Sequence, residues 1–136
     1  MKTYLTAYIA TALVFLCVDA IWLSTMASQL YRPLLGDILR ESFALAPAVF
    51  FYLIYVAGIV FFAIRPAFAG GGIATALLHG AAFGFCAYAT YDLTNHATLK
   101  DWPLAITLAD LAWGTFVTAT SAALGFAITR TVVGQV

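Results

Sequence analysis

The chain has 136 residues, of which 64% are apolar and 9% are charged, against roughly 25% charged residues in an average globular protein. Six basic and six acidic side chains are too few to cover the surface of a water-soluble protein of this size. The formal net charge of zero gives no indication of a nucleic-acid partner. The composition therefore excludes a soluble domain and predicts one integral membrane domain over residues 1–136.

The charged residues are clustered, so that four long stretches of the sequence contain none. A helix needs about 20 mainly apolar residues to cross the hydrocarbon core of a bilayer. The pattern therefore predicts an all-α fold, a bundle of four transmembrane helices. We expect these spans at about 4–23, 43–64, 73–94 and 103–129.

The longest connection, residues 24–42, has apolar residues after Pro33 at positions 34, 35, 38 and 39, the spacing of one helix face. It predicts a short amphipathic helix lying in the interface between the first two spans. Arg65 and Pro66 end the second span, and the run Gly70 to Gly72 forms a tight connection to the third.

Small residues indicate how the last two spans pack. Ala76, Gly80 and Gly84 recur every four residues in the third span, and Gly114 lies in the fourth. Such rows allow the backbones of membrane helices to approach closely. We expect these residues to pack the third span on the fourth, and the same face could also serve a homo-oligomer.

Four spans place both termini on one side of the membrane. That side carries Lys2, Arg65 and Arg130 with no acidic residue, whereas the other carries three basic and three acidic residues. The counts of Lys and Arg are equal, but unopposed positive charges in short segments favour the cytoplasmic side. We therefore expect both termini in the cytoplasm.

Three acidic residues within or at the ends of the spans converge on one depth. Asp19 lies near the end of the first span, Asp92 at the end of the third and Asp110 near the start of the fourth. Because successive spans alternate in direction, all three fall near the extracytoplasmic boundary. An unpaired carboxylate costs roughly 2.5 to 3.5 kcal/mol at the centre of a membrane helix and less toward the interface. This layer predicts either a functional polar site or a structural polar network.

Two more polar residues follow Asp92 on the same predicted helix face. Asn95 and His96 lie three and four residues after it, so one face could carry all three. A hydrated surface histidine is the alternative interpretation of His96. His79 lies about 20 Å from Asp92 along the helix, which excludes it from the site.

Each of the other two acids has a tryptophan three residues later. Trp22 follows Asp19 in the sequence DAIW, and Trp113 follows Asp110 in the sequence DLAW. An indole N–H can donate to a carboxylate, so we expect each pair to be partly satisfied within its own helix. Membership of an aromatic belt at the interface is the alternative for Trp22.

Three segments of the sequence carry a resemblance to a known family. They are DAIWL at 19–23, YDLTN at 91–95 and DLAWGT at 110–115. With these segments the chain resembles, over essentially its full length, a family of bacterial inner-membrane proteins known as domain of unknown function 2177. The resemblance implies a four-span protein of the bacterial inner (plasma) membrane and supplies no activity. Genes of this family are sometimes found among lipid-modification and oxidative-stress functions, which favours a lipid or a hydrophobic small molecule as partner.

Three functions are compatible with these features. The first is binding of a membrane lipid or hydrophobic small molecule near the outer leaflet. The second is a structural or regulatory subunit of a larger membrane complex. The third is proton or ion transport as an oligomer, although only His79 lies between the acids and the inner side. The predicted ligand-binding residues are Asp19, Trp22, Asp92, Asn95, His96, Asp110 and Trp113.

No spacing typical of a structural metal site, a catalytic nucleophile or a phosphate-binding loop is present in the sequence. The sequence therefore predicts no metal ligands, and it leaves open whether the protein is an enzyme and which cofactor, if any, it uses.

Overall fold

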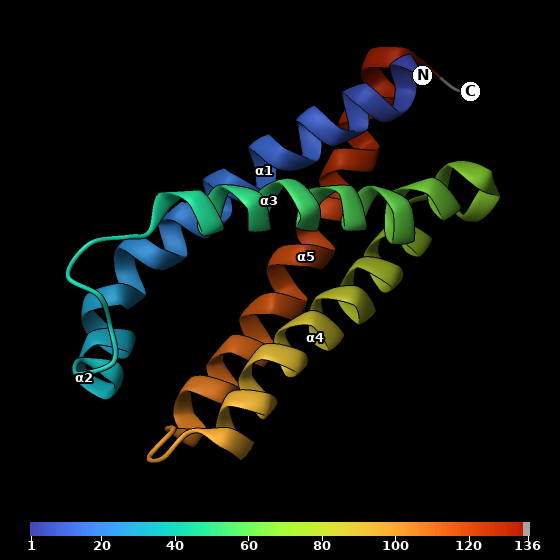
Figure 1. Cartoon of the computed structure of the whole chain (residues 1–136). Coiled ribbons are helices and arrows are strands. Elements are labelled where there is room, and N and C mark those ends of the chain that lie inside the picture. Colours follow the sequence, from blue (N-terminus) through green and yellow to red (C-terminus); the bar gives the residue numbers. More distant parts are fainter. Residues whose placement is uncertain (135–136) are drawn as a thin grey trace.

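The structure, a computed structural model, describes residues 1–134 (Figure 1). Every regular element of these residues is a helix. In chain order they are α1 (Lys2–Met26), η1 (Ala27–Tyr31), α2 (Arg32–Leu35), α3 (Leu45–Ile59), η2 (Val60–Ile64), η3 (Ala67–Gly71), α4 (Gly72–Thr98) and α5 (Leu104–Val133). The η elements are π-helical turns, whose hydrogen bonds join residues five apart.

Three of the helical runs are long and apolar enough to cross a membrane, namely Lys2–Leu35, Leu45–Thr98 and Leu104–Val133. The second run contains 54 residues, and its backbone leaves the helical conformation at Gly70, where φ is 114°. Gly72 follows with φ of 67°. At this break the chain turns, and α4 returns beside α5 (Figure 1).

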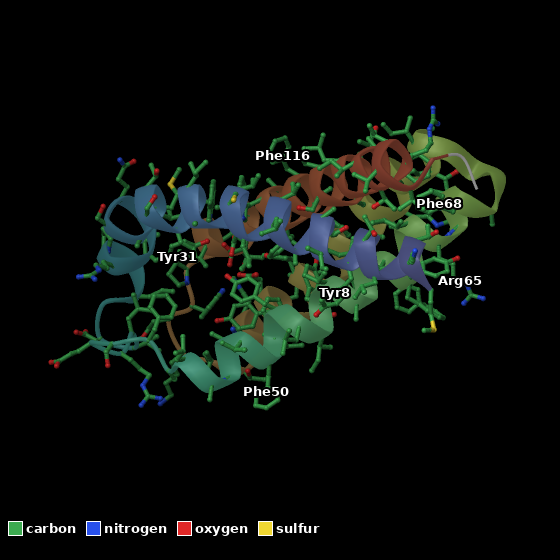
Figure 2. The ribbon with its side chains drawn as sticks, turned by 90° about the horizontal axis from the view of Figure 1, so that it is seen from above. Tyr8, Tyr31, Phe50, Arg65, Phe68 and Phe116 are labelled. Atoms are coloured by element: carbon green, nitrogen blue, oxygen red, sulfur yellow. The ribbon has the colours of Figure 1, made fainter. Side chains whose placement is uncertain are left out.

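The distribution of side chains is the reverse of that in a soluble protein. Large apolar side chains lie outside, as Phe50 and Phe116 do on different sides of the molecule (Figure 2). Eight polar or charged residues lie inside: Thr11, Asp19, Asp92, Thr107, Asp110, Thr118, Ser121 and Thr129. An apolar exterior is stable against lipid, and the buried polar groups can then contact one another. The fold is that of an all-helical membrane protein.

Helices α4 and α5 approach each other closely where small residues face each other. A Cβ atom at Gly80 would lie 2.8 Å from the Ala122 Cβ. A Cβ atom at Gly84 would collide with the backbone oxygen of Gly114. Ala76 is also fully buried. Glycine is therefore required at Gly84, because the colliding atom belongs to the backbone and cannot move alone.

The segment after α1 differs from the expected interfacial helix. Helix α1 continues through η1 into α2, which has four residues, and residues 36–44 contain only turns and bends. Ile38 and Leu39 of the expected apolar face are exposed. Pro33 directly follows the end of the π-helical turn η1, and the helical run continues through it to Leu35 instead of ending before it.

The molecule is elongated and has two distinct ends. At one end, called the α2 end, Leu35 packs with Trp102 and Ile106, so α2 and the α4–α5 connection are in contact. At the other end lie the N-terminus, the C-terminal turn of α5 and the α3–α4 turn (Figure 1). Figure 2 shows Tyr31 and Arg65 at these opposite ends.

Candidate functional site

The three carboxylates of the predicted polar layer are all buried toward the α2 end. The exposed fraction is 7% for Asp19, 0% for Asp92 and 6% for Asp110. Asp92 lies six residues before the end of α4 at Thr98, and Asp110 six residues after the start of α5 at Leu104. The antiparallel packing of these two helices therefore brings both acids to the same level.

Asp19 has a hydrogen-bond donor for each of its oxygens. The Tyr52 hydroxyl of α3 donates to Oδ2 at 2.5 Å, and the Trp113 indole of α5 donates to Oδ1 at 3.1 Å. Hydrogen bonds to a charged acceptor contribute about 1.5 to 3 kcal/mol each. This one carboxylate thus joins three helices.

Asp110 is bound through the π-helical turn η1. The Tyr31 hydroxyl at the end of η1 donates to Asp110 Oδ1 and accepts a bond from the Trp22 indole at 3.0 Å. The Trp22 ring in turn stacks on Trp113, with centroids 4.4 Å apart and planes inclined by 7°. Because Trp113 binds Asp19, a continuous set of contacts connects Asp19 to Asp110.

Asp92 differs from the other two acids. It is fully buried, and neither of its oxygens has a hydrogen-bond donor. Its carboxylate lies beside that of Asp110. Two carboxylates can form a hydrogen bond only by sharing a proton, since an ionised carboxylate accepts bonds and donates none. Apart from a proton shared with Asp110, no donor among residues 1–134 compensates the burial of Asp92.

Two details of the predicted site are wrong. The indoles do not bond to the acid in their own helix: Trp22 donates to Tyr31, and Trp113 donates to Asp19 across the α1–α5 interface. The spacing within one helix allows such a pair, but packing between the helices turns each indole toward a partner on another element.

The structure also separates the polar residues that follow Asp92 from the acid layer. His96 is exposed, and Asn95 is only half-buried. Neither forms a side-chain hydrogen bond to Asp19, Asp92 or Asp110 within the described residues. Among these same residues, no group of three His, Cys, Asp or Glu side chains is placed to hold a metal ion.

A cavity of about 680 Å³ opens beside this network at the α2 end. Its polar lining includes Tyr31 and Asp110 together with two arginines, Arg32 and Arg40. The apolar part of the lining is contributed by Leu23, Leu35, Leu39, Phe43, Trp102 and Ile106. Its volume falls within the range of about 300 to 1,000 Å³ typical of small-molecule sites.

Comparison with protein families identifies the chain. A family described as Predicted membrane protein (DUF2177) matches residues 4–127. The chain belongs to this family. The match includes all three acids, both stacked tryptophans and the residues that line the cavity. Comparisons with curated proteins and with solved structures give no match.

Several residues of this DUF2177 site escape the sequence reasoning. Tyr31 and Tyr52 donate to two of the acids. These contacts could have been predicted, because a buried tyrosine hydroxyl needs a hydrogen-bond partner and the acids lie at the same level. No feature of the sequence predicts that Arg32 and Arg40 line a cavity. Their position depends on the path of residues 36–44 between α2 and α3, which no local pattern encodes.

Proposed function

We propose that this DUF2177 protein crosses the bacterial inner membrane four times, with both termini in the cytoplasm and the α2 end outside. The length of the run Leu45–Thr98 supports two crossings there: 54 residues extend about 80 Å as a helix, whereas the hydrocarbon core is about 30 Å thick. The positive φ of Gly70 and Gly72 supplies the turn between them. Lys2, Arg65 and Arg130 then lie together on the cytoplasmic side.

Single cysteines labelled with a membrane-impermeant maleimide test this arrangement in a chain in which Cys17 and Cys86 are replaced by alanine. Ser42→Cys and Thr98→Cys should react from the periplasmic side, and Ala69→Cys only after the membrane is permeabilised. All three positions are exposed. Reaction of the cysteines at 42 and 98 from opposite sides would mean a single crossing and would refute the four-span topology.

The cavity at the α2 end then serves to bind a membrane lipid or another hydrophobic small molecule at the outer leaflet. The observation that carries this function is the cavity itself, whose mainly apolar lining also includes the polar side chains of Tyr31 and Asp110. Such a combination suits an amphiphile, whose chain is buried by the apolar wall while a few polar groups fix its orientation.

The buried network behind the cavity gives this site a fixed shape. The Tyr31 hydroxyl accepts a bond from Trp22 and donates one to Asp110, so the Tyr31 side chain cannot rotate freely. The stacked Trp22 and Trp113 rings extend this support to Asp19 and α3. Binding residues held by a second layer of contacts lose less conformational entropy when a ligand is bound.

A cavity-filling variant tests lipid binding. Ala44 lines the cavity and is half-buried, so Ala44→Trp should occupy part of the space. We expect native mass spectrometry from mild detergent to find a lipid retained by the wild-type chain and lost from Ala44→Trp. Ala82→Trp, on an exposed face of α4, is the matched control and should retain the lipid. Equal retention by all three chains would contradict the proposal.

One observation favours a second candidate, proton movement through the bundle. Contrary to the expectation from the sequence, His79 is not alone between the acids and the opposite end. Hydroxyl groups lie inside the bundle there: Tyr55 shares a hydrogen bond of 2.7 Å with Thr118, and Ser121 and Thr11 are buried without partners. Proteoliposomes containing a pH-sensitive dye distinguish the candidates. Proton flux that is abolished in Asp92→Asn would favour transport, and flux equal to that of empty vesicles would eliminate it.

A further inference from the structure

The depth of the cavity in the membrane can be counted along the first helical run. The run Lys2–Leu35 has 34 residues and extends about 50 Å, whereas about 20 residues suffice to cross the hydrocarbon core. Counting from Lys2, the core ends near Leu23, which is the first residue that lines the cavity. The residues of η1 and α2 that line the cavity follow Leu23 on this run, so they lie outside the hydrocarbon core, on the side of the lipid headgroups.

The cavity holds a large share of the few basic residues of the chain. Six Lys and Arg residues occur in the whole chain, and two of them, Arg32 and Arg40, line this cavity. Both are exposed. Glu41 is the one exposed acid in the lining, so the exposed lining carries two positive charges against one negative charge. The exposed part of the cavity is therefore positive.

The two arginines and Asp110 together decide which anion the cavity suits and where it would lie. The guanidinium group of arginine presents a planar fork of N–H donors that matches a phosphate, and it is less strongly hydrated than an ammonium group. The buried lining residue Asp110 offers carboxyl oxygens, one of which already accepts a bond from Tyr31, so it gives a phosphate no cationic partner there. The anion is thus favoured beside the arginines, and the apolar wall is left for hydrocarbon.

Building on the proposed lipid-binding function, we propose that the cavity selects an amphiphile with a phosphate headgroup, which Arg32 and Arg40 bind while the hydrocarbon part lies against Leu35, Phe43 and Trp102. A free phosphate would use the same arginines but would leave the apolar wall uncovered. The chemical class is therefore a phosphorylated lipid, and the phosphate is the feature that distinguishes it from a neutral lipid.

The experiment compares two probes that differ only in the phosphate, dioleoyl phosphatidate and dioleoylglycerol, titrated into the detergent-solubilised full chain and measured by native mass spectrometry. We expect phosphatidate to bind at least about tenfold more tightly, equivalent to about 1.4 kcal/mol. The variant Arg32→Gln/Arg40→Gln should reduce this preference to about twofold or less. The control Lys100→Gln/Arg130→Gln loses the same charge outside the cavity and should keep the preference.

The outcomes separate the headgroup assignment from the proposed lipid site. If Ala44→Trp weakens binding of both probes but the arginine variant keeps the preference, the headgroup assignment is wrong and the lipid site stands. If Ala44→Trp weakens neither, both are wrong. Displacement of phosphatidate by inorganic phosphate at equal concentration would identify a site for free phosphate and would overturn the amphiphile assignment.

Discussion

Replacing Asp92 by asparagine should stabilise the protein, although Asp92 is the most deeply buried of the three acids. A buried polar group without a partner costs about 1 to 3 kcal/mol, and neither oxygen of Asp92 has a donor. Asparagine has nearly the same shape, removes the acidic group and supplies an N–H that can donate to the neighbouring Asp110. The same substitution at Asp19 has the opposite effect, because Asp19 accepts bonds from both Tyr52 and Trp113.

The contacts give the size of both effects. In Asp92→Asn, the new bond from the amide N–H to Asp110 should raise the free energy of unfolding by about 0.5 to 1.5 kcal/mol, while the amide oxygen stays without a donor. In Asp19→Asn, one of the two accepting oxygens becomes an amide nitrogen that faces a donor, and the loss should be about 1.5 to 3 kcal/mol. The two isosteric substitutions in one layer thus differ in sign.

Reversible unfolding in mixed micelles of mild detergent and sodium dodecyl sulfate measures both free energies, with loss of helical circular dichroism as the signal. The wild-type chain and the two variants are compared at one pH and one lipid content. If Asp92→Asn lost as much stability as Asp19→Asn, the assignment of Asp92 as an uncompensated buried acid would be refuted. A destabilised Asp92→Asn would mean that the ionised carboxylate is itself stabilised.

Three further substitutions can be measured in the same way. Gly84→Val should lower the free energy of unfolding by about 1 to 3 kcal/mol through overpacking, because its side chain meets the α5 backbone. Ala82→Val, on an exposed face, should lower it by less than about 0.5 kcal/mol. Equal losses would contradict the close approach of α4 and α5. Tyr55→Phe should lose about 1 kcal/mol with its bond to Thr118, and an unchanged stability would mean that the bond contributes nothing. Gly72→Ala should lose about 1 to 3 kcal/mol because φ there is 67°, and a neutral effect would show that the turn relaxes.

Much of the architecture follows from elementary rules applied to the sequence. The scarcity of charge predicts a membrane protein, and the family match and the apolar exterior agree with it. The alternation of span direction predicts that Asp19, Asp92 and Asp110 share one level, which is a statement about position along the helix axis. Rise per residue is fixed at about 1.5 Å, so positions along an axis can be counted.

The rotation of a helix about its axis cannot be derived from the sequence by counting residues. The wrong predictions about the site concern this rotation. Which side of α5 faces α1 decides that Trp113 bonds to Asp19 instead of Asp110, and this depends on packing along the whole interface. His96 falls on the exposed side of α4 for the same reason. The path of residues 36–44, which brings Arg40 to the cavity, is set by contacts between distant parts of the chain and has no local signature.

The π-helical turn η1 has a consequence for comparing members of this family. Such a turn corresponds to one residue inserted into an α-helix, and each α-helical residue rotates the side chain by about 100°. A relative with one residue fewer between Trp22 and Tyr31 would form an ordinary helix there and would turn a different side chain toward Asp110. Relatives with the same number of residues between Trp22 and Tyr31 should therefore share the Tyr31 contact, and relatives with a different number should lack it. The length of this segment matters more than the identity of any residue in it.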